Sequence, residues 1–213
     1  MAAQQTTKRG RPKRTDAAEA ALRTKVASIA RELFARDGYE GVSMRRVAEA
    51  AGCSPAQLYT LFGGKRVLLR HIWEDAFAEL GEVLSKAAID SDPVLRLKAL
   101  GRAWCGFWLA NPDHYRAIFL IEDRVSEPGE RYFVETSESL SALDAVREAV
   151  REAADQGVLQ AEVPETAAEL LLCGWQGVVF NLITIPEYPW TARESLAGQM
   201  VDTLLRGLAP PGS

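Results

Sequence analysis

The sequence has few residues of the kinds that build metal centres, disulfides or hydrolytic active sites. Its 213 residues include three cysteines and two histidines. Cys53, Cys105 and Cys173 form no CxxC pair, which argues against a disulfide framework or zinc site and fits a reducing compartment. His71 and His114 stand in no metal-ligand spacing, and neither a G-x-S-x-G motif nor a phosphate-binding glycine loop occurs. We therefore expect no enzyme activity, no bound metal and no cofactor.

Long apolar runs and alternating patterns are also missing. The N-terminus is polar and then basic, without the apolar stretch of a signal peptide. The strongly apolar runs are shorter than the roughly 18 residues that a membrane-spanning helix needs. No segment alternates between apolar and polar residues as a half-buried β-strand does. These absences predict an all-α fold and a cytoplasmic, nucleoid-associated protein without a membrane partner.

Charge is distributed unevenly along the chain. Residues 1–70 contain 14 Lys and Arg against 6 Asp and Glu, whereas residues 71–213 contain 11 against 23. The first part therefore has a net charge of +8 and the second a net charge of −12, within a total of −4. A basic end on an acidic body predicts a surface for a polyanion at one end of the molecule. The alternative is a generic solvated surface.

Helix signals divide the chain into three regions with about nine helices in all. Residues 1–14 lack apolar periodicity and are expected to form a basic arm without fixed structure. Residues 15–70 have the pattern of three helices. Residues 71–213 continue as a helical domain, with one helix expected from about Arg131 to Gly157 and a Thr191–Glu194 capping box before the last helix.

Two short helices with a tight turn between them lie in the second region. Ser43 can cap a helix over Met44–Ala51, Gly52 ends it, and Ser54 caps a helix over about Pro55–Leu61. Two helices joined in this way form a helix-turn-helix, whose second helix presents its N-terminal residues to the major groove. The positions expected to be exposed on that helix are Pro55, Ala56, Gln57, Tyr59, Thr60 and Leu61.

Three neighbouring stretches form a specific set of motifs. They are ELFARDGYEG, then SMRRVAEAAG, then LYTLF followed by Lys65, within about residues 22–69. This set resembles the N-terminal domain of the tetracycline-repressor (TetR) family, whereas the rest of the chain is similar to that family only in length and helical layout. The resemblance implies a three-helix DNA-binding domain over residues 15–70. It also implies that residues 71–213 bind a small-molecule effector and form a homodimer through the last two helices.

The resemblance implies roles for side chains in and beside the helix-turn-helix. Tyr59 and Lys65 occupy positions that contact phosphates. Ser43 and Ser54 combine capping with an approach to the DNA backbone, as helix N-termini favour anions. The positions implied as DNA-contacting are Ser43, Ser54, Gln57, Tyr59, Thr60, Lys65 and either Arg45 or Arg46.

Gln57 is the expected base reader, since a glutamine amide can bond adenine through two atoms. The alternatives are a solvated helix residue for Gln57 and a half-buried surface aromatic for Tyr59. The sequence departs from the family at Leu61, where a histidine is common, and at Gly63 and Gly64, where more polar residues are usual.

The arm contains the sequence R-G-R-P, which resembles the core of an AT-hook. Gly10 and Pro12 keep such a segment extended, so Arg9 and Arg11 can enter a narrow A·T-rich minor groove. The alternative is a basic tail that only adds affinity for phosphates.

Aromatic residues gather in the C-terminal region, where the resemblance implies an effector pocket. We predict that Trp104, Phe107, Trp108 and Trp175 line it and that its ligand is hydrophobic or planar. The alternative for each is a place in a filled helical core. For the dimer, Gly174 and Gly177 would allow close helix approach, with apolar surface from Leu170, Leu171, Val178, Leu182, Met200, Leu204 and Leu205.

Together these features predict a sequence-specific DNA-binding transcriptional regulator. The expected form is a homodimeric repressor that a small hydrophobic ligand releases from a palindromic operator. One alternative is an architectural or constitutive DNA-binding protein that responds to no ligand. A remote alternative is an enzyme that uses a cavity of the C-terminal domain.

Overall fold

The fold is entirely helical in the part of the chain that can be described. The computed structural model describes residues 16–123, 131–136, 143–160 and 163–210. Those ranges contain ten helices and no strand, which confirms the all-α prediction. One helix was expected from about Arg131 to Gly157. This was wrong, because the described part of that span contains two helices, α7 (Phe133–Thr136) and α8 (Asp144–Asp155). Arg9 and Arg11 of the basic arm lie outside the described residues.

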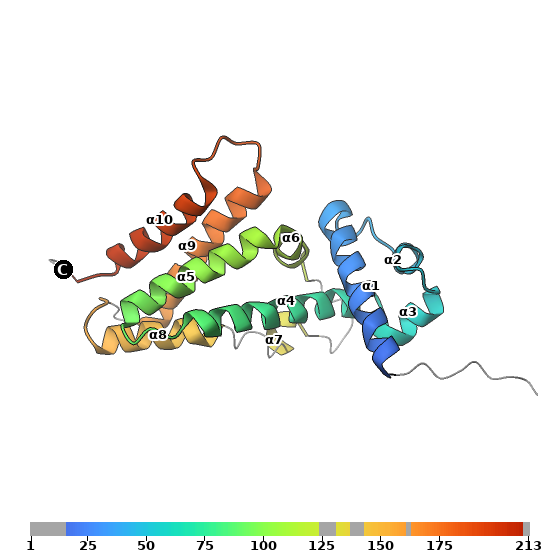
Figure 1. Cartoon of the computed structure of the whole chain (residues 1–213), viewed down its shortest axis with the longest axis horizontal. Coiled ribbons are helices and arrows are strands. Elements are labelled where there is room, and N and C mark those ends of the chain that lie inside the picture. The colour runs from blue at the N-terminus through green and yellow to red at the C-terminus, as the bar shows by residue number, and fades with distance from the viewer. Residues whose placement is uncertain (1–15, 124–130, 137–142, 161–162, 211–213) are drawn as a thin grey trace, which may run out of the picture.

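Three helices form a compact head at one end of the molecule (Figure 1). They are α1 (Asp16–Asp37), α2 (Met44–Ala51) and α3 (Pro55–Phe62), close to the expected bounds. Their apolar faces meet in one cluster, the head core, which includes Val26, Phe34, Val47, Leu58 and Phe62. Arg23 of α1 ties the far end of α3 to this core, since its guanidinium donates to the Leu61 carbonyl over 2.9 Å.

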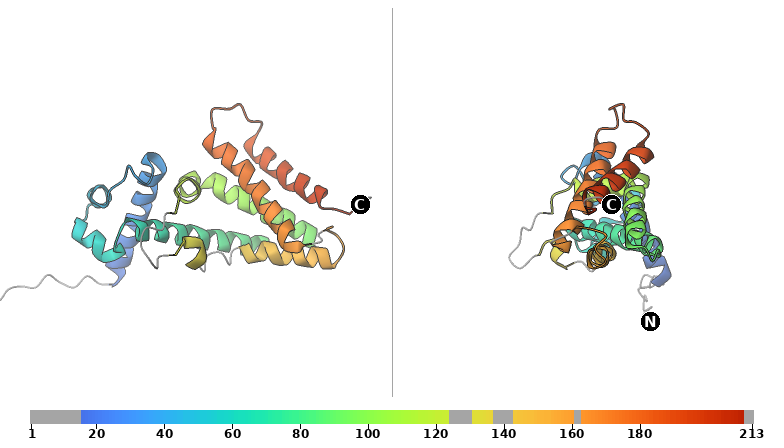
Figure 2. Two further views of the ribbon diagram at one scale, coloured as in Figure 1. Left: turned by 180° about the vertical axis from the view of Figure 1, so that it is seen from behind. Right: turned by 90° about the vertical axis from the view of Figure 1, so that its left-hand side faces the viewer.

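The remaining helices form an elongated body. They are α4 (Lys65–Ala87), α5 (Pro93–Ala110), α6 (Pro112–Phe119), α7, α8, α9 (Pro164–Thr184) and α10 (Arg193–Gly207). Helix α5 is central, since it contacts α4, α6, α8, α9 and α10. Seen from behind, α9 passes across α5 with α10 beside it (Figure 2).

Helix α9 is long and apolar enough to cross a membrane by length and composition alone. Its packing gives another reason for that composition. Ala168, Leu171, Trp175 and Val179 are buried against the rest of the body, and the helix contacts α5, α8 and α10. The apolar content of α9 is therefore accounted for by a helix that lies at the centre of a core.

Helix α4 joins the head to the body without a break. Its first turns bury Leu68, Leu69 and Ile72 in the head core, and its later turns bury Phe77 and Leu80 in the core of the body. The side chain of Trp73, between these two sets, packs against both cores. One continuous helix therefore connects the two ends of the molecule.

The start of α10 differs from the expected capping box. The helix begins at Arg193, its N-cap residue is Ala192, and no side chain caps it. Thr191 lies one residue too early to serve as the N-cap, so the prediction was wrong. The first N–H groups of a helix have no partner within the helix, and here no capping side chain supplies one.

Candidate nucleic-acid interface

The turn between α2 and α3 is built from local hydrogen bonds. Ser43 accepts the Arg46 N–H at 3.2 Å and so caps α2, as expected. Gly52 ends that helix with a φ of 69°, in the left-handed region that glycine adopts without strain, and its N–H donates to Glu49 and Ala48 carbonyls. These contacts fix the angle at which α3 leaves the turn.

A reciprocal capping box closes the N-terminus of α3. The Gln57 N–H donates to Ser54 Oγ over 3.2 Å, and the Ser54 N–H donates to Gln57 Oε1 over 3.1 Å. Gln57 is therefore a structural residue of the turn as well as the expected base reader. A two-atom contact with adenine uses both Oε1 and the amide NH₂, so Oε1 would have to leave Ser54. Its base-reading role stays a prediction.

Two of the expected contact residues of α3 are exposed to solvent. The Tyr59 side chain is 52% exposed, and Thr60 is exposed while its hydroxyl donates to the Ala56 carbonyl over 2.8 Å. Leu61 was expected to be exposed too, and this was wrong, since it is 9% exposed and packs in the head core.

The structure separates the two arginines that open α2. Arg46 pairs with Asp37 over 2.7 Å and donates to the Gly41 carbonyl over 3.2 Å, which ties α2 to the end of α1. Arg45 is exposed and has no hydrogen bond or ion pair with the described residues. Arg45 is thus the better placed of the two for a phosphate.

Lys65 has structural partners that the sequence pattern did not reveal. Its ammonium donates to the Tyr39 carbonyl over 2.7 Å and to the Val42 carbonyl over 3.0 Å. It also lies 3.9 Å from the centroid of the Tyr39 ring. Lys65 therefore fastens the start of α4 to the loop between α1 and α2, and its phosphate contact stays a prediction.

Contacts between the head and α6 form a second feature that sequence analysis missed. Arg31 of α1 donates to Nε2 of His114 on α6 over 2.5 Å. Burial of the ring, together with the adjacent Arg31 charge, lowers the pKa of His114 from 6.5 to about 4, so the ring is neutral and can accept this bond. On the other side of α4, Arg66 pairs with Asp123 over 2.6 Å. Nothing in the spacing of these residues could have indicated the pairs.

The four aromatic residues expected to line an effector pocket lie in the core of the body. Trp104, Phe107, Trp108 and Trp175 are all buried. Trp108 is fully buried, and its ring packs against five others, those of Phe77, Trp104, Phe107, Tyr115 and Phe119. The indole N–H groups of the three tryptophans have no partner among the described residues. Their contact with a ligand stays a prediction.

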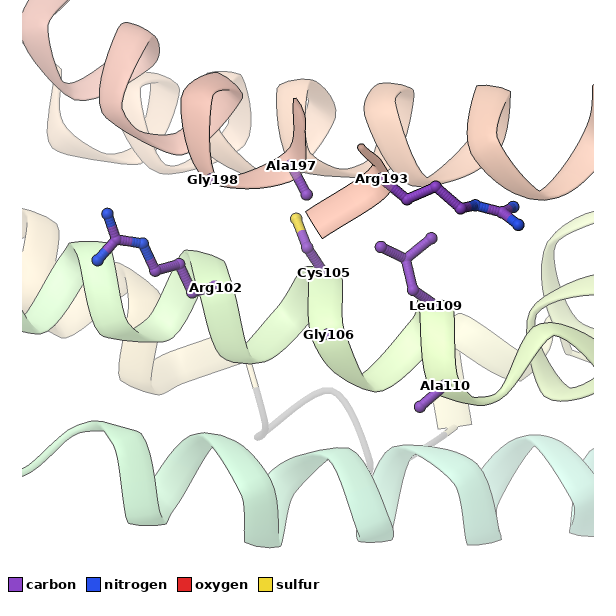
Figure 3. A pocket seen from close by; sticks show the side chains of 8 residues that line it. All are labelled: Arg102, Cys105, Gly106, Leu109, Ala110, Arg193, Ala197 and Gly198. Carbon is purple, nitrogen blue, oxygen red and sulfur yellow. The ribbon is translucent and has the colours of Figure 1, made fainter. Parts of the chain in front are cut away.

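An open cavity lies on another face of α5. This cavity, the α5–α10 cleft, has a volume of about 610 Å³. It is lined by two arginines, Arg102 and Arg193, and by the small or apolar residues Cys105, Gly106, Leu109, Ala110, Ala197 and Gly198. Cys105 and Ala197 point toward each other between α5 and α10, and the two arginines extend toward opposite ends (Figure 3). Burial raises the pKa of the Cys105 thiol to about 12, so the arginines are the charged groups that line the cleft.

Within the described residues, no group of three or more His, Cys, Asp and Glu side chains is placed to hold a metal ion. His71 lies 3.4 Å from Asp75, one turn along α4, and His114 is occupied by Arg31. The polar chemistry of the head is therefore that of caps, exposed hydroxyls and cations.

Two family models match most of the chain. A model of bacterial regulatory proteins of the tetR family matches residues 28–72, and a model of a tetracyclin repressor-like C-terminal domain matches residues 97–204. The HTH-type transcriptional repressor AcnR of Corynebacterium efficiens is 27% identical over 153 residues, which cover 70% of this chain and 75% of that protein.

Solved structures have the same fold. A regulatory protein of the tetR family from Rhodococcus RHA1 superposes with a TM-score of 0.74 at 19% identity, covering 88% of this chain and 97% of its own. AibR, solved with isovaleryl coenzyme A and operator DNA, has a TM-score of 0.68 at 26% identity, covering 89% of this chain and 99% of its own. The resemblance found in the helix-turn-helix thus extends to the C-terminal domain. The chain belongs to the tetR family of bacterial regulatory proteins.

Proposed function

We propose that this chain represses transcription as a homodimer on a palindromic operator and that a small hydrophobic ligand releases it. The observation that carries the proposal is the capped α3, which presents the exposed Tyr59 and Thr60 at the end of the molecule farthest from α10. A capped N-terminus with exposed polar neighbours suits a helix that enters a major groove. AcnR is named as a repressor, and AibR was solved with both a ligand and operator DNA.

The dimer forms through α9 and α10 in this proposal. Leu170, Cys173 and Phe180 are exposed on α9, and a Cβ added to Gly177 would meet no atom within 4 Å. These positions are three, seven and ten residues apart from Leu170, so they share one face of the helix. An isologous contact of this face would match a palindromic site.

Several residues expected at that interface serve the protomer instead. Leu171, Val178, Leu182 and Leu205 are buried in the core of the body. Gly174 faces Leu204 of α10, where an added Cβ would come within 2.4 Å of Leu204 Cδ1, so it permits the contact of α9 with α10. The dimer face is consequently narrower than the sequence pattern indicated.

Operator binding by the full chain tests the proposal. Genome-wide mapping of bound sites identifies the operator, and affinity is then measured over a range of salt concentrations. Arg45→Ala is expected to weaken binding to every sequence and to reduce the salt slope by about one, whereas Tyr59→Ala should weaken binding with little change in slope, because a phenol carries no charge. Arg147→Ala, a change at a partly exposed arginine of α8 in the body, is the matched control and should leave the slope unchanged. Failure of the wild-type chain to select any palindrome would contradict the proposal.

The basic arm gives a test between the regulator and an architectural protein. Removing residues 1–14 is expected to reduce affinity most for operators with A·T-rich flanks, where a narrow minor groove attracts Arg9 and Arg11. Uniform loss over all flanks would mean that the arm only contacts phosphates. Broad binding to A·T-rich DNA without a discrete operator would favour the architectural alternative. We propose neither a catalytic role nor a membrane location, and place the protein on the nucleoid in the cytoplasm.

A further inference from the structure

Two glycines of the α5–α10 cleft have no packing role within the chain. Gly106 lies inside α5, and a Cβ added there would meet no atom within 4 Å. Gly198 lies inside α10, and a Cβ there would meet only Arg102 Nε, at 4.0 Å. A glycine inside a helix makes that helix less stable than an alanine would. Glycine at these two positions therefore lowers the stability of α5 and α10 and leaves open space beside each helix.

Neighbouring glycines show what a packing role looks like. A Cβ on Gly101 would come within 2.7 Å of the Trp175 ring, and one on Gly174 would come within 2.4 Å of Leu204. Those two glycines are required because a large side chain occupies the space beside them. At Gly106 and Gly198 no neighbouring atom of the protomer would lie closer than 4.0 Å to an added Cβ, so the cleft has room there for an occupant from outside the protomer.

The two arginines of the cleft differ in electrostatic state. Arg102 is paired with Asp202 at 3.2 Å, a carboxylate that Lys98 also approaches at 3.9 Å. Arg193 donates to the Leu182 carbonyl and has no acidic partner among the described residues. A guanidinium has five N–H donors, so most of those of Arg193 stay available. The cleft therefore has one unpaired cation, at the end where α10 begins.

The first turn of α10 adds to this positive end. The helix begins at Arg193 and no side chain caps it, so its first N–H groups have no capping partner. Helix N-termini attract carboxylates and phosphates. From Arg102 to Leu109 the α5 side of the cleft extends for about 10 Å along an α-helix and is apolar beyond Arg102. The volume of about 610 Å³ lies in the range of small-molecule sites.

We infer that the α5–α10 cleft binds small amphipathic carboxylates, with the carboxylate at Arg193 and the apolar chain over Gly106, and that this binding is the ligand step of the proposed function. The route to the head is short. Asn111 is both the last cap of α5 and the first cap of α6. Helix α6 then contacts α1 through His114 and Arg31. An occupant that separates α5 from α10 would move α6 against the head.

Calorimetric titration of the full chain with octanoate tests the site without any need for DNA. Octanol and acetate are the matched probes, since one lacks the charge and the other the apolar chain, and both should bind at least about tenfold more weakly. Arg193→Gln should weaken octanoate binding by about tenfold or more, because a hydrogen-bonded charge is lost. Gly106→Leu should abolish it by filling the space.

Gly106→Ala is the control for the second variant, because it gains the same helix propensity and adds one carbon only. It should bind octanoate within about threefold of wild type, an energy difference below 1 kcal/mol. Circular dichroism of each variant confirms folding. If Gly106→Leu fails to fold, Arg193→Gln still tests the site, because Arg193 is exposed and its replacement should not disturb the core.

Operator binding is then measured with and without octanoate. Release from the operator in wild type but not in Arg193→Gln would support the inference. No octanoate binding, or equal binding by all variants, would overturn the inferred site. The proposed repressor function would still be supported by the affinity for the operator. A shift of the dimer dissociation constant by Gly106→Leu, with no octanoate binding, would assign the cleft to a second copy of the chain. Binding in the cleft without release of DNA would overturn the ligand step.

Discussion

The head and the body are stabilised by different kinds of contact. In the head, short helices meet through local polar caps, the Ser43 cap, the Gly52 turn and the Ser54–Gln57 box, around a mostly aliphatic core. In the body, α9 and α10 begin without side-chain caps, and the core is organised around the rings that surround Trp108. Local chemistry therefore fixes the turn between α2 and α3, whereas long-range packing places α9 and α10.

Replacing the central ring of the body should have the largest effect. Trp108→Ala removes a fully buried ring with five ring neighbours, and we expect a loss of about 3–5 kcal/mol in the free energy of unfolding. Urea unfolding measures it. Trp190→Ala, at a half-buried ring that contacts the Tyr188 ring and donates to the Ile185 carbonyl, is the control and should cost less. A stable Trp108→Ala protein with an altered ligand response would favour a pocket around this ring.

The corresponding test in the head concerns Lys65. Lys65→Met keeps most of the apolar stem but removes the ammonium that holds the Tyr39 and Val42 carbonyls, so we expect a loss of roughly 1–3 kcal/mol of stability. Urea unfolding measures the structural role of Lys65, and operator titration over a range of salt concentrations measures its contact with phosphate. Reduced stability with an unchanged salt slope would make Lys65 an anchor of the α1–α2 loop. A salt slope reduced by about one, as expected for Arg45→Ala, would support a phosphate contact by Lys65.

The same contrast explains which features could be predicted from the sequence. Ser43, Gly52 and Ser54 act on residues within five positions of themselves, so α2, α3 and the turn between them followed from local signals. Arg31 meets His114 and Lys65 meets Tyr39 across long stretches of chain, and no local spacing encodes such pairs. In the body, aromatic residues at helical spacing indicate a ring-rich region, but a core and a pocket have the same pattern. The volume of the cleft and the open space beside Gly106 and Gly198 distinguish it from the core. Glycines inside helices did not indicate it, because Gly101 and Gly174 have the same sequence context and are packed.

A substitution of Gln57 can separate its capping role in α3 from its predicted contact with a DNA base. Gln57→Glu keeps an oxygen acceptor for the Ser54 N–H, as in a Ser-x-x-Glu capping box, but removes the NH₂ donor. We expect stability close to wild type and a loss of about 1–3 kcal/mol in preference at one base pair of each half-site. Affinities for the operator and for operators changed at each position measure that preference. An unchanged ratio would leave Gln57 a capping residue only.

Acid should weaken the contact between head and body. The unfolded chain protonates His114 near its ordinary pKa of 6.5, whereas the buried ring beside Arg31 has a pKa of about 4. Between these values the unfolded state binds more protons, so the free energy of unfolding falls as the pH decreases from 6.5 to 4, and His114 contributes no pH dependence above that window.

Unfolding by urea at several pH values checks this expectation. His114→Gln, which can still accept from Arg31, should flatten the dependence. Arg31→Gln should reduce it only in part, because burial of the ring remains the larger cause. A wild-type slope that survives His114→Gln would assign the effect to other groups.

The continuity of α4 sets the size of the smallest fragment that can fold as a DNA-binding module. A chain cut after residue 70, where the charge pattern changes sign, would end at the second turn of α4, with Leu68 and Leu69 on a frayed end. It would also lack Ile72, Ala117 and Phe133, which complete the head core from beyond the cut. The head is thus one cooperative unit with the first turns of α4 and with α6, and its opening in hydrogen exchange should involve these segments together.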